Sequence, residues 1–420
     1  MYLLSIFLLL LPLELLGAAT LNLPTAQSTS MTERPLLNAA RQTIVASTKD
    51  EQRIQGQLLP QLSVSHSSAY YNLLGVNESA HTVTLQGSQL IFNAAGPLLQ
   101  GEIASLTTAR NTFQYQASSQ EVRYTVATNF LQAWLLQEKA ALMQALADYT
   151  DQLEQNNDQL LKTGSINTIT WSATAATVAQ NRATIAAYPL TAQSALKTLK
   201  QSMGSHGTDI AHLSYTLETP LPRRKTVDDY VALAYVHRPE LKDKDAAAEQ
   251  QTLIARSYRR SYLPTVSTQA SLGNTFGGAR IEQGKTVNIG VTLQWNLFDG
   301  FQGVRAAQAA DANRLRTSFE KQELKNAIAT NIANLYNTLC SNEMLAVATQ
   351  KRKEAQQALL TQTTAAFATQ AVDALVLAKD TYEYESAAHE LRTQHITLHI
   401  NWQTLAWYCG YPTSGVLHES

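Results

Sequence analysis

Residues 287–300 read VNIGVTLQWNLFDG, and this stretch decides the fold. Apolar side chains take every second position from Val287 to Leu297, and Asn, Gly, Thr and Gln take most of the positions between them. Such an alternation, with one apolar and one polar face, is typical of a half-buried β-strand. Beyond Gly303 the apolar residues recur at helical spacing instead. The sequence therefore predicts a strand that leads through a tight turn into a helix.

The same order of elements occurs twice, with an offset of about 204 residues. Leu59-Pro60 corresponds to Leu263-Pro264, and Thr163-Gly164 corresponds to Thr369-Gln370. Each copy is predicted to contain two strands, a long helix, a tight turn and a second helix, which makes the fold class α+β. The predicted repeats are residues 20–222, with strands at about 60–95 and helices at about 99–203, and residues 223–412, with strands at about 263–298 and helices at about 303–410. The helix before Leu59 is expected to be shorter than its counterpart before Leu263.

Long helices dominate both copies. Apolar residues step by three, four or seven, as at Leu142, Leu146 and Leu153, which is coiled-coil spacing. Residues 99–161 contain no Pro, so they predict one helix about 93 Å long, and residues 303–367 predict a similar one. Rods of this length do not fit a compact globule, and they are too sparsely apolar for lipid. They are expected to pack together in an aqueous compartment and to project away from the strands.

The two ends of the chain are read as separate segments. Residues 1–19 have an apolar run followed by small residues, which favours a secretory signal peptide over a buried helix. Residues 413–420 are read as a short tail. No later segment has eighteen consecutive apolar residues, so an exported protein would be periplasmic, secreted or a β-barrel. Cys340 and Cys409 are interpreted as two buried thiols, with a disulfide as the alternative.

Enzymatic and nucleic-acid-binding motifs are missing. The formal net charge is -1 and only 15% of residues are charged, which argues against a nucleic-acid partner. No GxxxxGK[ST] loop is present, and the run from His389 to Thr393 lacks the second His of a zinc protease helix. His395 and His399 are four residues apart but have no third ligand, so packing is favoured over a metal site. We predict no catalytic residue, no cofactor and no metal.

Several motifs together resemble the outer-membrane efflux family, the TolC-like channels. The likeness covers about Leu36 to Tyr411. It rests on the duplicated plan, the two Leu-Pro pairs, and the step Leu297-Phe298-Asp299-Gly300. Arg238-Pro239-Glu240-Leu241 and the turn Thr163-Gly164 complete it. Each motif is weak alone, and their order gives the resemblance its specificity.

The resemblance implies an α+β membrane protein that assembles as a homotrimer. Three protomers would form one twelve-stranded β-barrel in the outer membrane of a Gram-negative bacterium, on an α-helical barrel in the periplasm. The helical end would meet a periplasmic adaptor protein and an inner-membrane pump. The chain would then be a passive exit duct for small molecules or exported polypeptides. The alternatives are an exported coiled-coil scaffold without a pore and an exported hydrolase.

Three sets of residues follow from this reading. The lipid-facing positions of the fourth strand are Val287, Ile289, Val291, Leu293 and Trp295. The lumen-facing positions are Asn288, Thr292 and Gln294. The candidate gate and adaptor-contact turns contain Lys162, Thr163, Gly164, Ser165, Phe367, Thr369, Gln370 and Asp373.

The second turn departs from the family pattern. Gln370 stands where a Gly is expected, so this turn should be conformationally costlier or built differently from the first. Val376 and Lys379 stand where acidic residues are usual, and Thr170 does so in the first copy. We therefore expect an end closed by packing and neutral hydrogen bonds rather than by salt bridges, with Phe367 either in the aperture or in the core.

Overall fold

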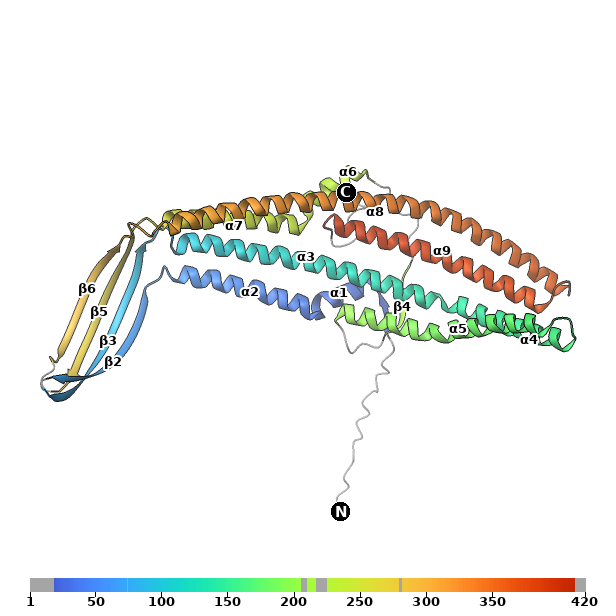
Figure 1. Ribbon diagram of the computed structural model, residues 1–420, viewed down its shortest axis with the longest axis horizontal. Coiled ribbons are helices and arrows are strands. Elements are labelled where there is room, and N and C mark those ends of the chain that lie inside the picture. Colours follow the sequence, from blue (N-terminus) through green and yellow to red (C-terminus); the bar gives the residue numbers. More distant parts are fainter. Residues whose placement is uncertain (1–18, 74, 205–209, 217–224, 279–281, 412–420) are drawn as a thin grey trace, which may run out of the picture. The chain divides into compact units, whose positions relative to one another are not determined.

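The chain divides into two compact units. A computed structural model describes residues 19–73, 75–204, 210–216, 225–278 and 282–411 (Figure 1). Unit 1 contains Met1–Leu37, Ser119–Ala234 and Thr330–Ser420, and unit 2 contains Asn38–Ser118 and Tyr235–Ala329. Of the predicted signal peptide, only Ala19 is described, where it begins a strand, and the predicted tail lies outside the described residues.

Unit 2 contains a four-stranded antiparallel sheet. Its strands are β2 (Gln61–Leu73), β3 (Val76–Phe92), β5 (Thr265–Gly277) and β6 (Gly284–Gln294). Their order is β2-β3-β5-β6, so the hairpin from each copy meets the other along β3 and β5 (Figure 1). The four strands lie where the sequence predicts two pairs. β2 and β6 are the edges of the sheet.

Four helical segments accompany the sheet in unit 2. They are most of α2 (Pro35–Gly56), α7 (Pro239–Arg260), and the first parts of α3 (Pro97–Glu138) and α8 (Gln302–Ala368). Polar contacts join neighbouring helices. Arg110 Nε on α3 lies 2.9 Å from Asp243 Oδ1 on α7. Lys244 Nζ on α7 lies 2.7 Å from Glu320 Oε2 on α8.

The helices that lead into the two hairpins have equal lengths. α2 and α7 have 22 residues each, so the expectation of a shorter first copy is wrong. The helices before them also match, because α1 (Leu23–Glu33) and α6 (Val227–His237) have 11 residues each. Arg34-Pro35 in the first copy corresponds to Arg238-Pro239 in the second, and in both copies the Pro opens the longer helix. The duplication therefore begins before the first strand pair.

Unit 1 is built mainly from helices. It contains α4 (Ala140–Lys162), α5 (Thr168–Met203), α9 (Ala374–Tyr408) and the remaining parts of α3 and α8. Its core includes Leu142, Met143 and Leu146 of α4, with Ile185 and Tyr188 of α5 and Tyr382 of α9 against them. One small sheet was not predicted: β1 (Ala19–Asn22) pairs in parallel with β4 (Ile210–Ser214).

The long helices are as predicted in the second copy and differ in the first. α8 runs for 67 residues, which corresponds to about 100 Å. The helix predicted over residues 99–161 is two helices, because α3 ends at Glu138 and α4 begins at Ala140. The Leu136 carbonyl accepts the Lys139 amide at 3.2 Å and the Tyr188 hydroxyl at 3.0 Å. These two donors occupy a carbonyl that an unbroken helix would bond to residue 140.

Among the described residues, no helix has the length and the apolar character needed to cross a membrane. Cys340 and Cys409 are not joined in a disulfide. Cys409 is buried, as predicted, and its Sγ lies 3.7 Å from the Tyr230 carbonyl oxygen. Cys340 is half-buried.

Candidate functional site

The register of the sheet separates its side chains into two chemically different faces. Residues paired directly across an antiparallel sheet share a face. We call one side the apolar face. It carries Leu62, Val64, Val83, Leu85, Val266, Ala270, Leu272, Val287, Ile289, Val291 and Leu293. None of these side chains is buried in the described chain, and Ile289 is 83% exposed. A contiguous exposed apolar surface of this kind marks a contact with lipid or with another protein.

The opposite side, the polar face, carries mostly hydroxyl and amide side chains. Its members include Ser63, Ser65, Ser67, Thr82, Thr84, Gln86, Ser88, Ser267, Gln269, Ser271, Thr275, Thr286, Asn288, Thr292 and Gln294. None is buried in the described chain. Thr82 and Thr275, which pair across β3 and β5, bring their hydroxyl oxygens to 3.1 Å. The positions predicted to alternate on β6 therefore do lie on opposite sides of the sheet.

Sequence reasoning missed the parts of both faces on β2 and β3. The pairing of β3 with β5 shifts between Leu90 and Phe92, where Ile91 is an extra residue. This bulge moves Phe92 to the apolar face although its number is even. A strict period of two therefore fails along β3, and the faces become clear only from the cross-strand register.

Trp295 was predicted as the last lipid-facing residue of β6, but the strand ends at Gln294. The indole Nε1 of Trp295 donates to the Tyr262 carbonyl at 2.9 Å. The hydroxyl of Tyr262 in turn donates to Asp299 Oδ1 at 2.9 Å, and Asp299 Oδ2 accepts the Gly303 amide at 2.8 Å. The Gly303 amide lowers the pKa of Asp299. These bonds hold the turn between β6 and α8 against the residues that precede β5.

The sheet has two open edges. β2 and β6 each pair with one neighbour in the described chain, which leaves a row of backbone N–H and C=O groups on each outer side. Such edges bind further strands and are rarely left bare in a stable protein. Both edges of the sheet are therefore available for pairing with further strands.

The two helical turns have the same backbone design. In the first, the Gly164 amide donates to the Leu161 carbonyl at 3.0 Å and the Ser165 amide to the Leu160 carbonyl at 2.9 Å. In the second, the Gln370 amide donates to Phe367 and the Ala371 amide to Ala366, both at 2.9 Å. This is the Schellman arrangement that ends a helix on a left-handed residue.

Gly164 has φ 74° and Gln370 has φ 57°, so the second turn is not built differently from the first. Gln370 adopts the left-handed conformation that costs an L-residue free energy. The second turn therefore has the same backbone construction as the first, and it is the conformationally costlier of the two because its left-handed residue is Gln. Thr163 and Thr369 occupy equivalent positions one residue earlier, and each hydroxyl donates to a carbonyl of the preceding helical turn.

Each turn continues into a helix through a capping side chain. Asn167 Oδ1 accepts the Thr170 amide at 2.8 Å, and Asp373 Oδ1 accepts the Val376 amide at 2.9 Å. Neither Lys162 nor Asp373 forms an ion pair in the part of the chain that the structure describes. Both turns lie at the same end of unit 1 (Figure 1).

Other side chains near the second turn are packed or paired locally. Phe367 is 40% exposed, which places it partly in solvent and not in the core. Asp380, one helical turn beyond Val376, is buried and accepts a hydrogen bond from the Thr363 hydroxyl on α8. Lys379 lies 3.8 Å from Glu383 on the same helix. Asp380 is thus engaged inside the hairpin, whereas Lys162 and Asp373 remain exposed at the two turns.

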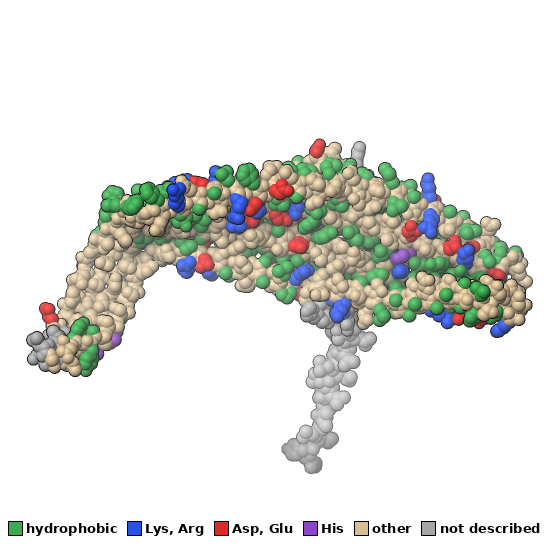
Figure 2. All heavy atoms as spheres, in the orientation of Figure 1, with side chains coloured by type: hydrophobic (Ala, Val, Ile, Leu, Met, Phe, Trp, Pro, Cys, Tyr) green, Lys and Arg blue, Asp and Glu red, His purple; other side chains and the backbone are tan. Residues whose placement is uncertain are grey.

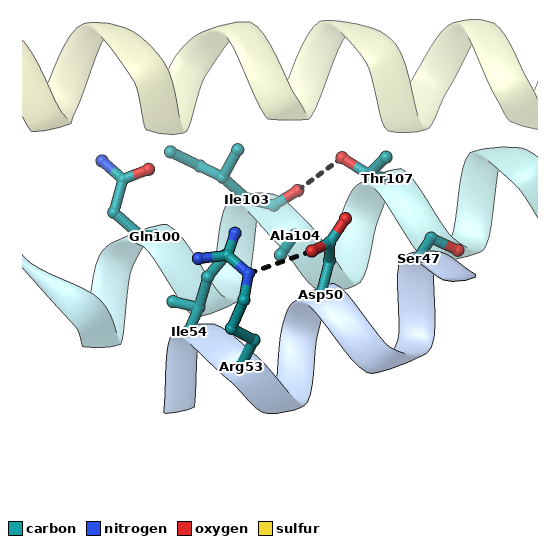
Figure 3. A pocket seen from close by; sticks show the side chains of 8 residues that line it. All are labelled: Ser47, Asp50, Arg53, Ile54, Gln100, Ile103, Ala104 and Thr107. Carbon is teal, nitrogen blue, oxygen red and sulfur yellow. Dashed lines mark hydrogen bonds and ion pairs between the residues drawn. The ribbon is translucent and has the colours of Figure 1, made fainter. Parts of the chain in front are cut away.

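A shallow groove in unit 2 lies between α2 and α3 (Figure 3). It has a volume of about 240 Å³, and the ion pair of Asp50 with Arg53, 3.0 Å apart, lies at its edge. The Thr107 hydroxyl is already bonded to the Ile103 carbonyl and to Gln250. The Ser47 hydroxyl likewise donates to the Ile44 carbonyl, and no general base lies beside either hydroxyl in the lining, so we assign the groove no chemistry.

The histidines of α9 are held by packing. Burial lowers the pKa of His389 and of His395; the charges of Lys139 and Arg392 lower that of His389 further, and the charge of Lys353 lowers that of His395. His399 lies on the same helix, and its Nδ1 is 3.1 Å from the Tyr215 hydroxyl. In the described residues no group of three His, Cys, Asp or Glu side chains could hold a metal ion.

Comparison with known proteins identifies the fold. No protein-family model and no curated protein matches the sequence. The channel protein CusC matches 93% of this chain and 92% of its own with a TM-score of 0.75 and 14% identity. The Campylobacter jejuni outer-membrane channel CmeC gives 0.78, with 93% and 86% covered at 14% identity. The Vibrio cholerae outer-membrane protein VceC gives 0.71, with 93% and 96% covered at 15% identity.

The chain therefore has the fold of a bacterial outer-membrane channel protomer. The TolC-like architecture that the sequence motifs predict is confirmed at the level of the fold.

Proposed function

We propose that the chain is one protomer of an outer-membrane exit duct for a tripartite efflux or type I secretion system of a Gram-negative bacterium. The observation that carries this is the sheet with one exposed apolar face and one polar face. Strands of a membrane barrel alternate in this way, with apolar side chains toward lipid and polar side chains toward a water-filled lumen. On this proposal Val287, Ile289, Val291 and Leu293 face lipid, and Asn288, Thr292 and Gln294 face the lumen.

The open edges support a trimer. Lipid offers no partner to unpaired backbone groups, so a membrane sheet must close on itself. Four strands are too few to close, whereas three protomers of four strands each would supply twelve. β6 of one protomer would then pair with β2 of the next, and the strands would form a single barrel.

The helical part would form the periplasmic tunnel. Its helices carry ion pairs and exposed polar surfaces that suit water and not lipid. The two turns at the end of unit 1 would contact a periplasmic adaptor, and an inner-membrane pump would supply the energy. The chain itself would be a passive conduit for small molecules or exported polypeptides and would catalyse no reaction. A coiled-coil scaffold without a pore would not require the exposed apolar face of the sheet.

A matched pair on β6 tests the proposal. Val291→Arg places a charge on the apolar face and should cost about 2–4 kcal/mol of insertion free energy if the site lies near the membrane midplane. Thr292→Arg is the control on the polar face, and it should insert and trimerise normally. Membrane fractionation and native mass spectrometry in detergent give the readouts. A stable monomer with intact β-structure, or equal loss from both substitutions, would contradict the proposal.

A further inference from the structure

We propose that the lumen of the barrel is electrically neutral and admits cationic, anionic and uncharged solutes equally. This proposal rests on the proposed function, because it requires that the strands form a barrel. Selection by charge would then take place outside the barrel, in the helical part or in the partner proteins.

The polar face has no charged side chain across the body of the sheet. Of its described members on all four strands, Glu78 alone carries a charge. Glu78 pairs with Tyr71, and it lies beyond Gly277, the last residue of β5. Lys285 pairs with Asn274 in the register of the apolar face, so it too lies away from the polar face.

The helices of unit 2, unlike the body of the polar face of the sheet, carry charged side chains. Arg110, Asp243, Lys244 and Glu320 form ion pairs between helices. Figure 2 shows acidic and basic side chains along the helices, whereas the middle of the sheet has none in this view. The neutrality therefore belongs to the strands and does not reflect a chain that is poor in charge throughout.

Hydroxyl and amide groups can serve either sign of solute. Ser and Thr hydroxyls donate and accept, and Asn and Gln amides do both through separate atoms. Anions can therefore use the donors and cations the acceptors of the same wall. Without fixed charges the wall does not focus an electric field, so it neither concentrates nor repels an ion of either sign.

Cysteine accessibility measures the lumen potential directly. We would introduce Thr292→Cys or Ser271→Cys into a Cys340→Ser background, and leave the fully buried Cys409 in place. The intact protein in lipid vesicles would be treated with methanethiosulfonate reagents that carry either a trimethylammonium or a sulfonate group. Val291→Cys, on the apolar face next to Thr292, is the control.

Rates are divided by those of a small thiol in solution, which removes the intrinsic difference between the reagents. Each kT/e of lumen potential would multiply the cation-to-anion ratio by about sevenfold, because the two reagents respond in opposite directions. We expect a ratio within about threefold of one at both low and high salt. Gln269→Glu should then raise the ratio at low salt, which shows that the assay can detect a charge.

The outcomes separate the two proposals. A ratio in the wild-type lumen that exceeds about tenfold and shrinks with added salt would overturn the neutral lumen and leave the channel intact. Reaction of Val291→Cys without reaction of Thr292→Cys and Ser271→Cys would reverse the facing and overturn the proposed function itself. Protection of all three positions would also overturn it, because no water-filled lumen would exist.

Discussion

The left-handed residue of each helical turn allows a reciprocal test of the duplicated design. Gly164 and Gln370 occupy the same position, with φ of 74° and 57°, and the same hydrogen-bond pattern surrounds each. We predict that Gln370→Gly stabilises the second turn and that Gly164→Gln destabilises the first. The double variant exchanges the residues and should exchange the stabilities of the turns.

The expected size follows from backbone conformation alone. A Cβ placed on Gly164 would have no atom within 4 Å, so side-chain crowding does not contribute there. The left-handed conformation costs an L-residue roughly 1–2 kcal/mol. Glycine gives back about 0.5–1 kcal/mol through its greater freedom in the unfolded chain. The net gain from Gln370→Gly should be about 0.5–1 kcal/mol of local stability, with a loss of similar size from Gly164→Gln.

Hydrogen exchange measured by mass spectrometry on the detergent-solubilised protein reports this locally. The informative amide is that of Ala371, which donates to Ala366 at 2.9 Å and whose residue is not altered. One kcal/mol corresponds to about fivefold in an opening equilibrium, so this amide should exchange about two- to fivefold more slowly in Gln370→Gly. The Ser165 amide in the first turn is the internal control. Unchanged exchange at Ala371, or unchanged exchange at Ser165 in Gly164→Gln, would refute the reasoning.

Three further outcomes are expected. In planar bilayers, Phe367→Ala should raise resting conductance more than Asp373→Asn, because Asn still caps α9 as Asn167 caps α5; the reverse ranking would favour an electrostatic gate. Burial lowers the pKa of His389, so the unfolded chain takes up the proton first as pH falls below about 6.5, and stability is lost. His389→Gln should therefore reduce the fall in melting temperature between about pH 7.5 and 5.5; an unchanged fall would exclude this histidine as its source. Asp299→Ala removes the acceptor of the Gly303 amide and of the Tyr262 hydroxyl, so it should lower the melting temperature more than Asp299→Asn does, and equal effects would contradict that role.

The parts of the fold that were predictable have strong local signals. The alternation from Val287 to Leu293 needs no tertiary information, and the register places these residues as the pattern predicts. The repeat of Leu-Pro pairs and turn motifs fixes the order of elements in both halves. A run of helical heptads without Pro is sufficient to predict α8 from end to end within one or two residues.

Features that depend on distant residues could not be predicted from local pattern. The break at Lys139 depends on the Tyr188 hydroxyl, which is 52 residues from the carbonyl that it binds. The faces of β3 depend on a bulge that is visible only against β5. Trp295 fits the alternation of β6 but bonds to the Tyr262 carbonyl beyond the end of the strand. In each case a tertiary contact overrides a local preference.

The two helical hairpins show how a duplicated sequence gives unequal packing. Their turns and caps match, but α9 buries Leu391, Leu398, Trp402 and Leu405 along its length, whereas α5 buries Val178 and then little before Leu199. α4 packs against both helices, because Ile185 and Tyr188 of α5 and Tyr382 of α9 lie against its core residues, so the difference lies in the parts of α5 and α9 beyond these contacts.

The solvent-facing side of α5 consequently remains uncovered within one protomer, and its exposed residues include Ile169, 79% exposed, and Leu190, 68% exposed. Small side chains such as Ala173, Ala176 and Ala183 lie between them and permit close approach of another helix. In the proposed trimer this side of α5 would be covered by a neighbouring protomer. The same assembly would therefore satisfy both the uncovered side of α5 and the open edges of the sheet.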